Sequence, residues 1–480
     1  MRHIPQPTGI TLALFTALLA ACGVGGMQSS SAPTGGGVVP ATFEGPVAKA
    51  VCQDGDLEET ALQGQVPQAD RESGRTLTGY NCNLERVGHL PGQGAGWQHA
   101  WFEDCAYHNQ ATGNNPAPTN PGVVVVDVSN PAAPARTVSL NTQGMIDPWE
   151  SLKVNERRQM LAAVDSSNGN GSAAFDVYDI AGDCKQPALL FSGAVGTAIG
   201  HAGNWAPDGT TYYGGQLGNA ANFKAMDVTD ATAPTLIVQG FPIGTHDMSV
   251  STDGNRAYFA TTNPNSLQIL DVSQINNRTP NPESTIVGSV AWTDGSTAQM
   301  TQAVTIKGVP YILFVDEGGK GAARLIDISN EAAPFIASKL KLEVHMPENS
   351  QAISADQGSA IFGYQGHYCT ASDGINDNHT NTIDNAVIAV CGYFESGLRV
   401  FDIREPYSPK EIAYYNPPAS PGYKAGADYN LSGGCHTVDW ASSHPRYIPA
   451  RNEIWFTSQC GGFHVVRFEK PLAELLDPAP

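Results

Sequence analysis

The sequence predicts an all-β fold built from repeated four-stranded units. A short phrase, consisting of an apolar run, an aspartate, a turn residue and a downstream proline, recurs six times along the chain. Its aspartates are Asp127, Asp179, Asp227, Asp271, Asp327 and Asp402, and successive aspartates lie 44 to 75 residues apart. A period of this length is typical of one β-propeller blade, with loop insertions in the longer steps. The 51 glycines and 33 prolines agree with such a turn-rich chain.

Each copy of the phrase predicts a strand, a turn and the start of another strand. The first copy, VVVVDVSNP at 123–131, shows the pattern. Its β-branched run favours a strand, Asp127 and Ser129 suit a turn, and Pro131 cannot continue a hydrogen-bonded ladder. We expect these aspartates to hydrogen-bond the turn backbone rather than to bind calcium.

Seven blades follow from the segments around the phrases. Segments 201–214, 246–261 and 345–364 each predict a hairpin that opens a blade with a histidine. A last blade runs from Cys435 to Phe468, with Arg467 where the aspartate should be, and it lacks a fourth strand. We expect residues 83–90 to supply that strand and to close the ring, which removes an open sheet edge. The prediction is a seven-bladed β-propeller over 80–470 with an N-terminal strand in the last blade and a tail at 471–480.

The repeated phrases resemble the LVIVD repeat family of bacterial surface and exported propellers. The resemblance covers most of the chain after residue 80, and VVVVDVSNP is close to the family pattern. It implies the propeller fold and a binding or scaffold role toward a protein or glycan partner. It implies no agreed catalytic residues.

The first 22 residues predict export with a lipid anchor. Arg2 precedes a short apolar core at 10–20, which is too short to span a membrane. Leu19-Ala20-Ala21-Cys22 resembles the lipobox of a bacterial lipoprotein precursor, which implies lipidation of Cys22; a plain secretory signal is the alternative. Residues 23–79 then form a flexible tether and N-terminal extension. The expected location is the cell envelope, on the extracytoplasmic side, with outer-membrane delivery preferred in a two-membrane cell because Gly23 is not acidic.

The cysteine count agrees with export. Without Cys22 eight cysteines remain, which allow 105 pairings. Cys435 with Cys460 would join the ends of one hairpin, and Cys369 with Cys391 would close a polar insertion. Cys52–Cys82 and Cys105–Cys184 are then left over. Thiolate metal ligation is the alternative, but the chain has no CxxC motif.

Composition and motifs exclude several functions. The formal net charge of −20 argues against nucleic acid as a partner, because its binding needs a basic face. The chain has no Walker loop, GxSxG or HExxH motif, so nucleotide hydrolysis, serine-hydrolase chemistry and zincin proteolysis have no support.

The histidines carry the sharpest functional signal. Superposing the predicted blades places five of them at one position, in blades 1, 3, 4, 6 and 7: His99, His201, His246, His345 and His436. Blade 2 offers Glu150 there, and blade 5 Gln299 or Gln302. The first strand of each blade lines the channel, so these side chains would converge on a transition metal, copper or zinc. The arrangement is similar to the channel histidines that hold copper in nitrous oxide reductase and the selenium-binding protein family. His108 and His367 are second-rank candidates.

Two classes of function therefore stay open. The histidines could instead hydrogen-bond the backbone of a neighbouring blade, and the protein would then act as a binding or scaffold module. Alternatively the channel mouth holds a metalloenzyme, copper oxidase-like or lactonase-like, in which Glu150 is a ligand or a base.

Overall fold

The computed structural model describes residues 41–92, 97–109, 122–166, 174–217, 222–356, 363–377, 382–421 and 435–477. Residues 40–480 form one compact unit. The predicted signal peptide, Cys22 and the tether at 23–37 lie outside the described residues. Lipidation and the domain boundaries therefore stay predictions.

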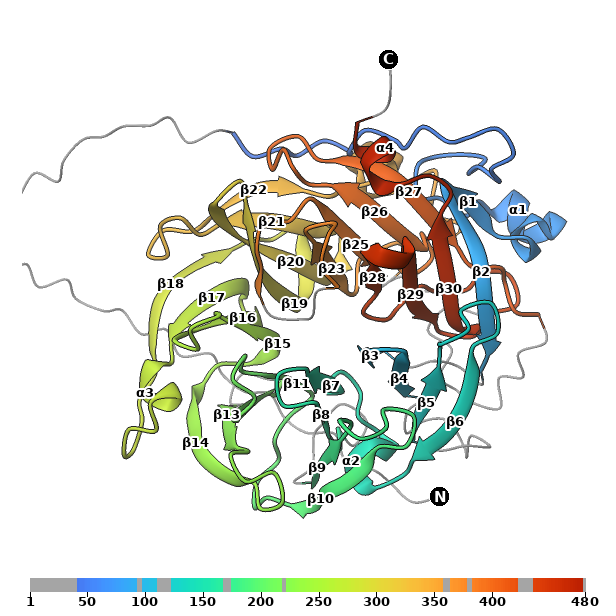
Figure 1. The fold of residues 1–480 in the computed structure, drawn as a ribbon. Coiled ribbons are helices and arrows are strands. Elements are labelled where there is room, and N and C mark those ends of the chain that lie inside the picture. Colours follow the sequence, from blue (N-terminus) through green and yellow to red (C-terminus); the bar gives the residue numbers. More distant parts are fainter. Residues whose placement is uncertain are drawn as a thin grey trace, which may run out of the picture. The chain divides into compact units, whose positions relative to one another are not determined.

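Seven sheets, antiparallel except for the short strand β24 (Thr382–Ile383), are arranged in a ring, as the sequence predicts (Figure 1). The innermost strands of blades 1 to 7 are β3 (His99–Phe102), β7 (Lys153–Asn155), β11 (Ala202–Trp205), β15 (Thr245–Val250), β19 (Gly295–Ile306), β23 (Cys369–Ser372) and β28 (Arg446–Ile448). The second strands are β4 (Cys105–Asn109), β8 (Met160–Val164), β12 (Thr211–Gly215), β16 (Arg256–Thr262), β20 (Val309–Gly319), β25 (Ile388–Gly392) and β29 (Glu453–Ser458). The third strands are β5 (Val123–Asp127), β9 (Ala174–Asp179), β13 (Asn222–Asp227), β17 (Asn265–Asp271), β21 (Ala323–Asp327), β26 (Leu398–Asp402) and β30 (Gly462–Phe468). The outermost strands of blades 1 to 6 are β6 (Ala135–Leu140), β10 (Ala188–Ala194), β14 (Thr235–Pro242), β18 (Thr285–Ala291), β22 (Phe335–Lys339) and β27 (Lys410–Asn416).

The ring closes with the N-terminal strand in blade 7. Strand β2 (Leu84–Pro91) pairs antiparallel with β30, from Leu84 opposite Phe468 to Pro91 opposite Gly462. Blade 7 thus combines the two ends of the domain, and its outer edge is covered. This confirms the predicted closure.

Two blades carry a fifth strand that the sequence did not suggest. Strand β1 (Tyr80–Cys82) extends blade 6 beside β27, and β24 (Thr382–Ile383) lies parallel to β19 in blade 5. Both additions cover sheet edges.

The segment before the propeller packs on blades 5 and 6. Phe43 bridges to Ser338 and Ala48 to Lys410. Inside the segment lie helix α1 (Gln68–Ser73) and the 3₁₀ turn η1 (Arg75–Leu77), and Arg71 is buried in an ion pair with Glu395, 2.7 Å away. The other short helices are α2 (Gln143–Ile146), α3 (Ser273–Asn276), α4 (Leu472–Leu476), η2 (Glu343–His345), η3 (Pro347–Asn349) and η4 (Pro449–Arg451).

The six repeated aspartates cap turns, as predicted. Asp127 Oδ1 accepts hydrogen bonds from the N–H and the hydroxyl of Ser129, at 2.9 and 2.7 Å. The other five carboxylates likewise accept the backbone N–H two residues later, at 2.8 to 3.0 Å. The phrase therefore ends the third strand of a blade with a local side-chain turn.

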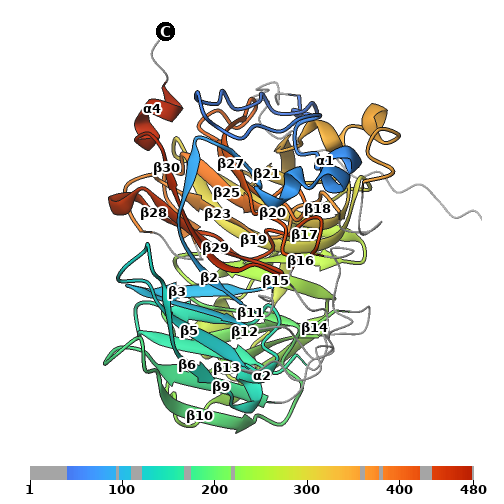
Figure 2. The same ribbon diagram turned by 90° about the vertical axis from the view of Figure 1, so that its right-hand side faces the viewer.

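The cores lie between neighbouring blades rather than within one sheet. One cluster joins Tyr258 and Leu267 of blade 4 to Ile312 and Phe314 of blade 5. Because each sheet packs against a neighbouring blade on both sides, both faces of many strands are buried. Figure 2 shows the blades side by side. Such interlocked blades give the channel a rigid wall.

Four disulfides join the eight cysteines in the expected pairs: Cys52–Cys82, Cys105–Cys184, Cys369–Cys391 and Cys435–Cys460. Cys369 and Cys391 are direct cross-strand partners on β23 and β25. Four disulfides indicate an oxidising, extracytoplasmic environment. No helix among the described residues is long and apolar enough to cross a membrane.

Candidate metal centre in the channel

Three acidic or imidazole side chains meet at the start of blades 2, 3 and 4. Glu150 lies just before β7, His201 just before β11, and His246 within β15. A bridge between Glu150 and Ala202 ties the first two segments together, and His201 N–H donates to the Gly215 carbonyl at 2.7 Å. Gly215 also allows the backbone of blade 4 to pack closely against blade 3, because a Cβ at this position would lie 2.4 Å from the His246 carbonyl oxygen. Backbone contacts thus set the approach of the three side chains.

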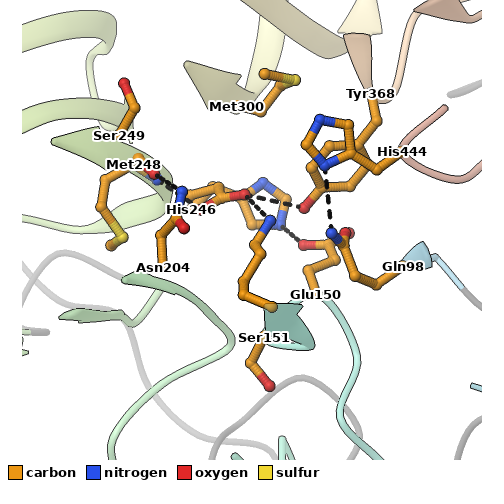
Figure 3. A network of polar contacts seen from close by, with 12 residues as sticks. Gln98, Glu150, Ser151, Asn204, His246, Met248, Ser249, Met300, Tyr368 and His444 are labelled. Atoms are coloured by element: carbon orange, nitrogen blue, oxygen red, sulfur yellow. Dashed lines mark hydrogen bonds and ion pairs between the residues drawn. The ribbon is translucent and has the colours of Figure 1, made fainter. Parts of the chain in front are cut away.

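The three side chains present their ligand atoms to one another. Glu150 Oε2 lies 3.0 Å from His201 Nε2 and 2.8 Å from His246 Nε2, and the two nitrogens are 2.7 Å apart. All three residues are buried. Figure 3 shows Glu150 and His246 facing each other, beside Tyr368 and His444. Ligand atoms that share one ion at about 2.0 to 2.2 Å lie about 3 Å apart, so this spacing suits a metal ion. Two further groups with metal-ligand spacing among the described residues, around Asp56 and Asp439, use cysteines that are bound in disulfides.

The charge of Glu150 and the tautomer of His246 favour a positive charge between these two side chains. His246 Nδ1 donates to the Ala298 carbonyl at 3.0 Å, so the neutral ring turns the lone pair of Nε2 toward Glu150. Burial lowers the pKa of His246. Burial by itself would raise the pKa of Glu150, but His246 and His201 lower it well below its usual range. A carboxylate and an imidazole lone pair 2.8 Å apart repel each other unless a proton or a metal ion lies between them.

His367 approaches Glu150 from the other side. Its Nε2 lies 3.1 Å from Glu150 Oε1, the carboxylate oxygen that does not face His201 and His246. Blade 5 contributes Gln299, whose Nε2 lies 3.1 Å from His367 Nε2, and Glu317, whose Oε1 lies 3.9 Å from it. Burial first, and then the negative charge of Glu150, raise the pKa of Glu317 well above its usual range.

A second polar network lies beside these side chains. Lys153 Nζ pairs with Asp247 Oδ2 at 2.9 Å, and Tyr368 donates its hydroxyl to the same oxygen at 3.3 Å. The Tyr368 ring stacks on His444, and Gln98 Nε2 contacts His444 Nδ1 at 3.4 Å (Figure 3). This network crosses between blades next to Glu150 and His246.

Aromatic rings cover the other side of the centre. Trp149 lies 5.5 Å from the His201 ring, and Trp97 and Phe394 each lie 5.1 Å from the His367 ring. Trp149 and Phe394 have backbone φ angles of +45° and +38°, a region that costs energy for a bulky residue. These rings exclude water from the carboxylate and the imidazoles.

Of the six predicted channel residues, the structure brings three together: Glu150, His201 and His246. His99 does begin the innermost strand of blade 1, but its Nδ1 donates to the His444 carbonyl at 2.9 Å, and its Nε2 has no hydrogen-bond partner among the described residues. This blade-to-blade hydrogen bond is the alternative role that the sequence left open.

The expected blade-start positions of His345 and His436 are wrong. His345 lies in the 3₁₀ turn η2, where its Nε2 donates to the Tyr364 carbonyl at 3.0 Å and its Nδ1 accepts the Leu342 N–H at 2.9 Å. His436 is exposed, ten residues before β28. The innermost strands of blades 6 and 7 begin farther along the chain, so His367 and His444 occupy the channel instead.

The sequence did contain a signal for His367. Gly366-His367-Tyr368 directly precedes Cys369, and the disulfide from Cys369 to Cys391 requires two neighbouring strands there. Because the hairpin at 345–364 was expected to begin blade 6, His367 was only a second-rank candidate.

A separate cavity of about 560 Å³ lies far from these side chains along the fold. It is bordered by residues 48–54, by the outer part of blade 6 and by helix α4. Lys49, Lys410 and Lys470 line it together with apolar groups such as Val51 and Leu475.

Comparison with known proteins identifies the repeat. The family described as LVIVD repeat matches residues 117–142 in blade 1 and 245–278 in blade 4. The chain therefore carries LVIVD repeats within its seven-bladed propeller, which confirms the resemblance seen in the sequence. No curated protein sequence matches the chain.

Solved structures with a similar fold share little sequence. A Lactobacillus plantarum protein is 11% identical, with a TM-score of 0.42 over 67% of this chain and 87% of that one. The Myceliophteria thermophila Cps50 (Swd1) β-propeller domain is 10% identical, with a TM-score of 0.49 over 81% of this chain and all of that one. Kuenenia stuttgartiensis hydrazine synthase is 11% identical, with a TM-score of 0.44 over 80% and 98%. At these sequence identities and TM-scores, the likeness to the solved structures says nothing about the activity of this chain.

Proposed function

We propose that this LVIVD-repeat propeller is a metalloprotein that binds one transition-metal ion through Glu150, His201 and His246. The observation that carries the proposal is the mutual spacing of Glu150 Oε2 and the two Nε2 atoms, 2.7 to 3.0 Å. The backbone carbonyl on His246 Nδ1 adds support, because metal-bound imidazoles usually donate their second nitrogen in this way.

The ligand set favours a metal with open coordination positions. Two histidines and one carboxylate bind catalytic zinc, and the same set binds iron(II) in non-haem oxygenases. Glu150 serves as a ligand in this arrangement, since three imidazoles surround its carboxylate and leave it little freedom to act as a base. Copper, which the arrangement of histidines suggested, is a further outcome of the same assay.

Elemental analysis of protein purified without added metal tests the proposal. We expect at least one metal ion per chain in the wild type after dialysis, and about one ion fewer per chain in the double variant His201→Ala/His246→Ala. The matched control is His436→Ala, because His436 is exposed and its Nδ1 contacts the Pro421 carbonyl instead. A wild type without stoichiometric metal would refute the proposal.

We also propose that a lipid on Cys22 anchors the protein on the extracytoplasmic side of a membrane. The lipobox-like LAAC and the four disulfides support this. Extraction of the wild type only by detergent, and release of Cys22→Ser without detergent, is the expected pattern.

Binding of a protein or glycan partner is a second candidate function. The cavity between residues 48–54, blade 6 and α4 favours it, because it is a concave surface with both cationic and apolar groups. Val51 is 88% exposed at this cavity. A partner that is retained by the wild type and by Val309→Asp, but lost by Val51→Asp, would support binding there; equal retention by all three would contradict it.

A further inference from the structure

The two oxygens of Glu150 face different imidazoles. Oε2 faces His201 and His246, and Oε1 faces His367 at 3.1 Å. We propose a second divalent-metal position, held by Glu150 Oε1, His367 and Glu317, so that Glu150 bridges two ions across the channel. This inference rests on the proposed function, because the first ion is the one bound by Glu150, His201 and His246.

His367 has the same local arrangement as His246. Its Nδ1 donates to the Ser442 carbonyl of blade 7, which directs Nε2 toward Glu150 and Glu317. The ring is fully buried between Trp97, Phe394 and Tyr368. A backbone carbonyl on one nitrogen and carboxylates around the other are the usual surroundings of a metal-bound imidazole.

Glu317 supplies a second carboxylate. It comes from β20 in blade 5, is 7% exposed, and its carboxylate accepts no hydrogen bond from the described residues. Two buried carboxylates, Glu150 and Glu317, thus flank one imidazole. Holding both groups in their charged form out of water is costly unless a positive charge lies between them.

Gln299 is an independent observation at the same place. Its side chain is fully buried and its Nε2 contacts His367 Nε2 at 3.1 Å. Its Oε1 has no hydrogen-bond partner among the described residues. A buried amide oxygen needs a donor or a cation; rotating the amide by 180° would turn this oxygen toward His367 Nε2, and oxygen is a suitable ligand for a divalent ion.

The two distances from His367 suit one ion. Donor atoms around an ion at 2.0 to 2.2 Å lie about 3 to 4 Å apart, and His367 Nε2 lies 3.1 Å from Glu150 Oε1 and 3.9 Å from Glu317 Oε1. The mixed nitrogen and oxygen set suits zinc, manganese or iron(II). Paired ions of this kind hold the attacking and the leaving oxygen in hydrolytic displacements, so an ester with an oxyanion is the substrate class that such a centre would take.

Cobalt(II) titration of the metal-free full-length protein tests the second position. Bound metal is counted by elemental analysis and followed by the visible absorption of Co²⁺. We expect two equivalents in the wild type and one in Glu317→Gln and His367→Ala, with the second equivalent bound at least about 100-fold more weakly. The matched controls Glu348→Gln and His436→Ala change exposed residues and should keep two.

Each outcome separates the two proposals. One equivalent in the wild type, lost in His201→Ala/His246→Ala, supports the single site and overturns the second. No bound cobalt in the wild type overturns both. Two equivalents in the wild type that persist in Glu317→Gln overturn the assignment to Glu317 and His367. Glu317→Gln is nearly isosteric, so it decides the question if circular dichroism shows that His367→Ala does not fold.

Discussion

The closing strand should be sensitive to a single methyl group at Gly88. This residue lies on β2 next to a register shift, and a Cβ placed there would lie 1.9 Å from the Pro131 carbonyl oxygen. Pro131 belongs to the turn of blade 1 that follows Asp127. Gly288 on β18 meets the turn of blade 5 in the same way, with its Cβ 2.0 Å from the Glu331 carbonyl oxygen. The outer strand of one blade thus packs closely on the repeat turn of the next.

The cost of Gly88→Ala follows from this distance. Ordinary Cβ contacts begin at 3.4 Å, so the backbone of β2 or of the turn must move by about 1.5 Å, the difference from 1.9 Å. Overpacking costs about 1 to 3 kcal/mol. The lower entropy of the unfolded alanine chain offsets about 0.4 to 1 kcal/mol of that. We expect a net loss of about 1 to 2 kcal/mol in the local stability of the closing strand.

Hydrogen exchange measures this loss where it occurs. A loss of 1 to 2 kcal/mol corresponds to roughly 5- to 30-fold faster exchange of the β2 and β30 amides, whereas melting of so large a domain would shift by only a few degrees. Gly193→Ala is the matched control, because Gly193 lies on the outer strand β10 and its Cβ would meet only the Phe191 ring, at 3.3 Å. Equal exchange of β2 in Gly88→Ala and the wild type would show that blade 1 does not clamp the closing strand.

Three further predictions address acid stability, the anchor and the metal. Burial lowers the pKa of His99 and His345 to about 3 and that of His108 to about 4, so the unfolded chain binds more protons below pH 6.5. The free energy of unfolding should therefore fall as the pH drops from 6.5 toward 4, and His345→Gln should flatten that slope by about 1.4 kcal/mol per pH unit, which denaturant titrations at several pH values would measure. Cys22→Ser should move the protein from the membrane to the soluble fraction with unchanged circular dichroism; continued membrane association would contradict the lipid anchor. Removing metal with a chelator should lower the melting temperature of the wild type by more than that of His201→Ala/His246→Ala, because an ion bound only by the folded state stabilises it by mass action.

The sequence by itself determined the features that depend on short-range patterns. The period of the Asp phrase predicted the blades, and each aspartate caps its turn through a residue two positions away, as Asp127 does with Ser129. The incomplete last blade predicted that the strand now seen at Leu84–Pro91 would close the ring. The Cys369–Cys391 disulfide followed from neighbouring strands, whereas Cys52–Cys82 and Cys105–Cys184 were only the pairs that remained. In each case the controlling contacts are local or set by the repeat itself.

Only the tertiary structure decided which histidines meet. Glu150, His201 and His246 begin blades without long insertions before them, so counting along the sequence placed them correctly. In blades 6 and 7 long segments precede the first strand, and spacing selected His345 and His436 where pairing selects His367 and His444. Cross-strand register decides where a strand begins, for example Cys369 opposite Cys391, and it depends on residues far apart in the chain. Glu317, on a second strand, reaches His367 only because blades 5 and 6 pack side by side.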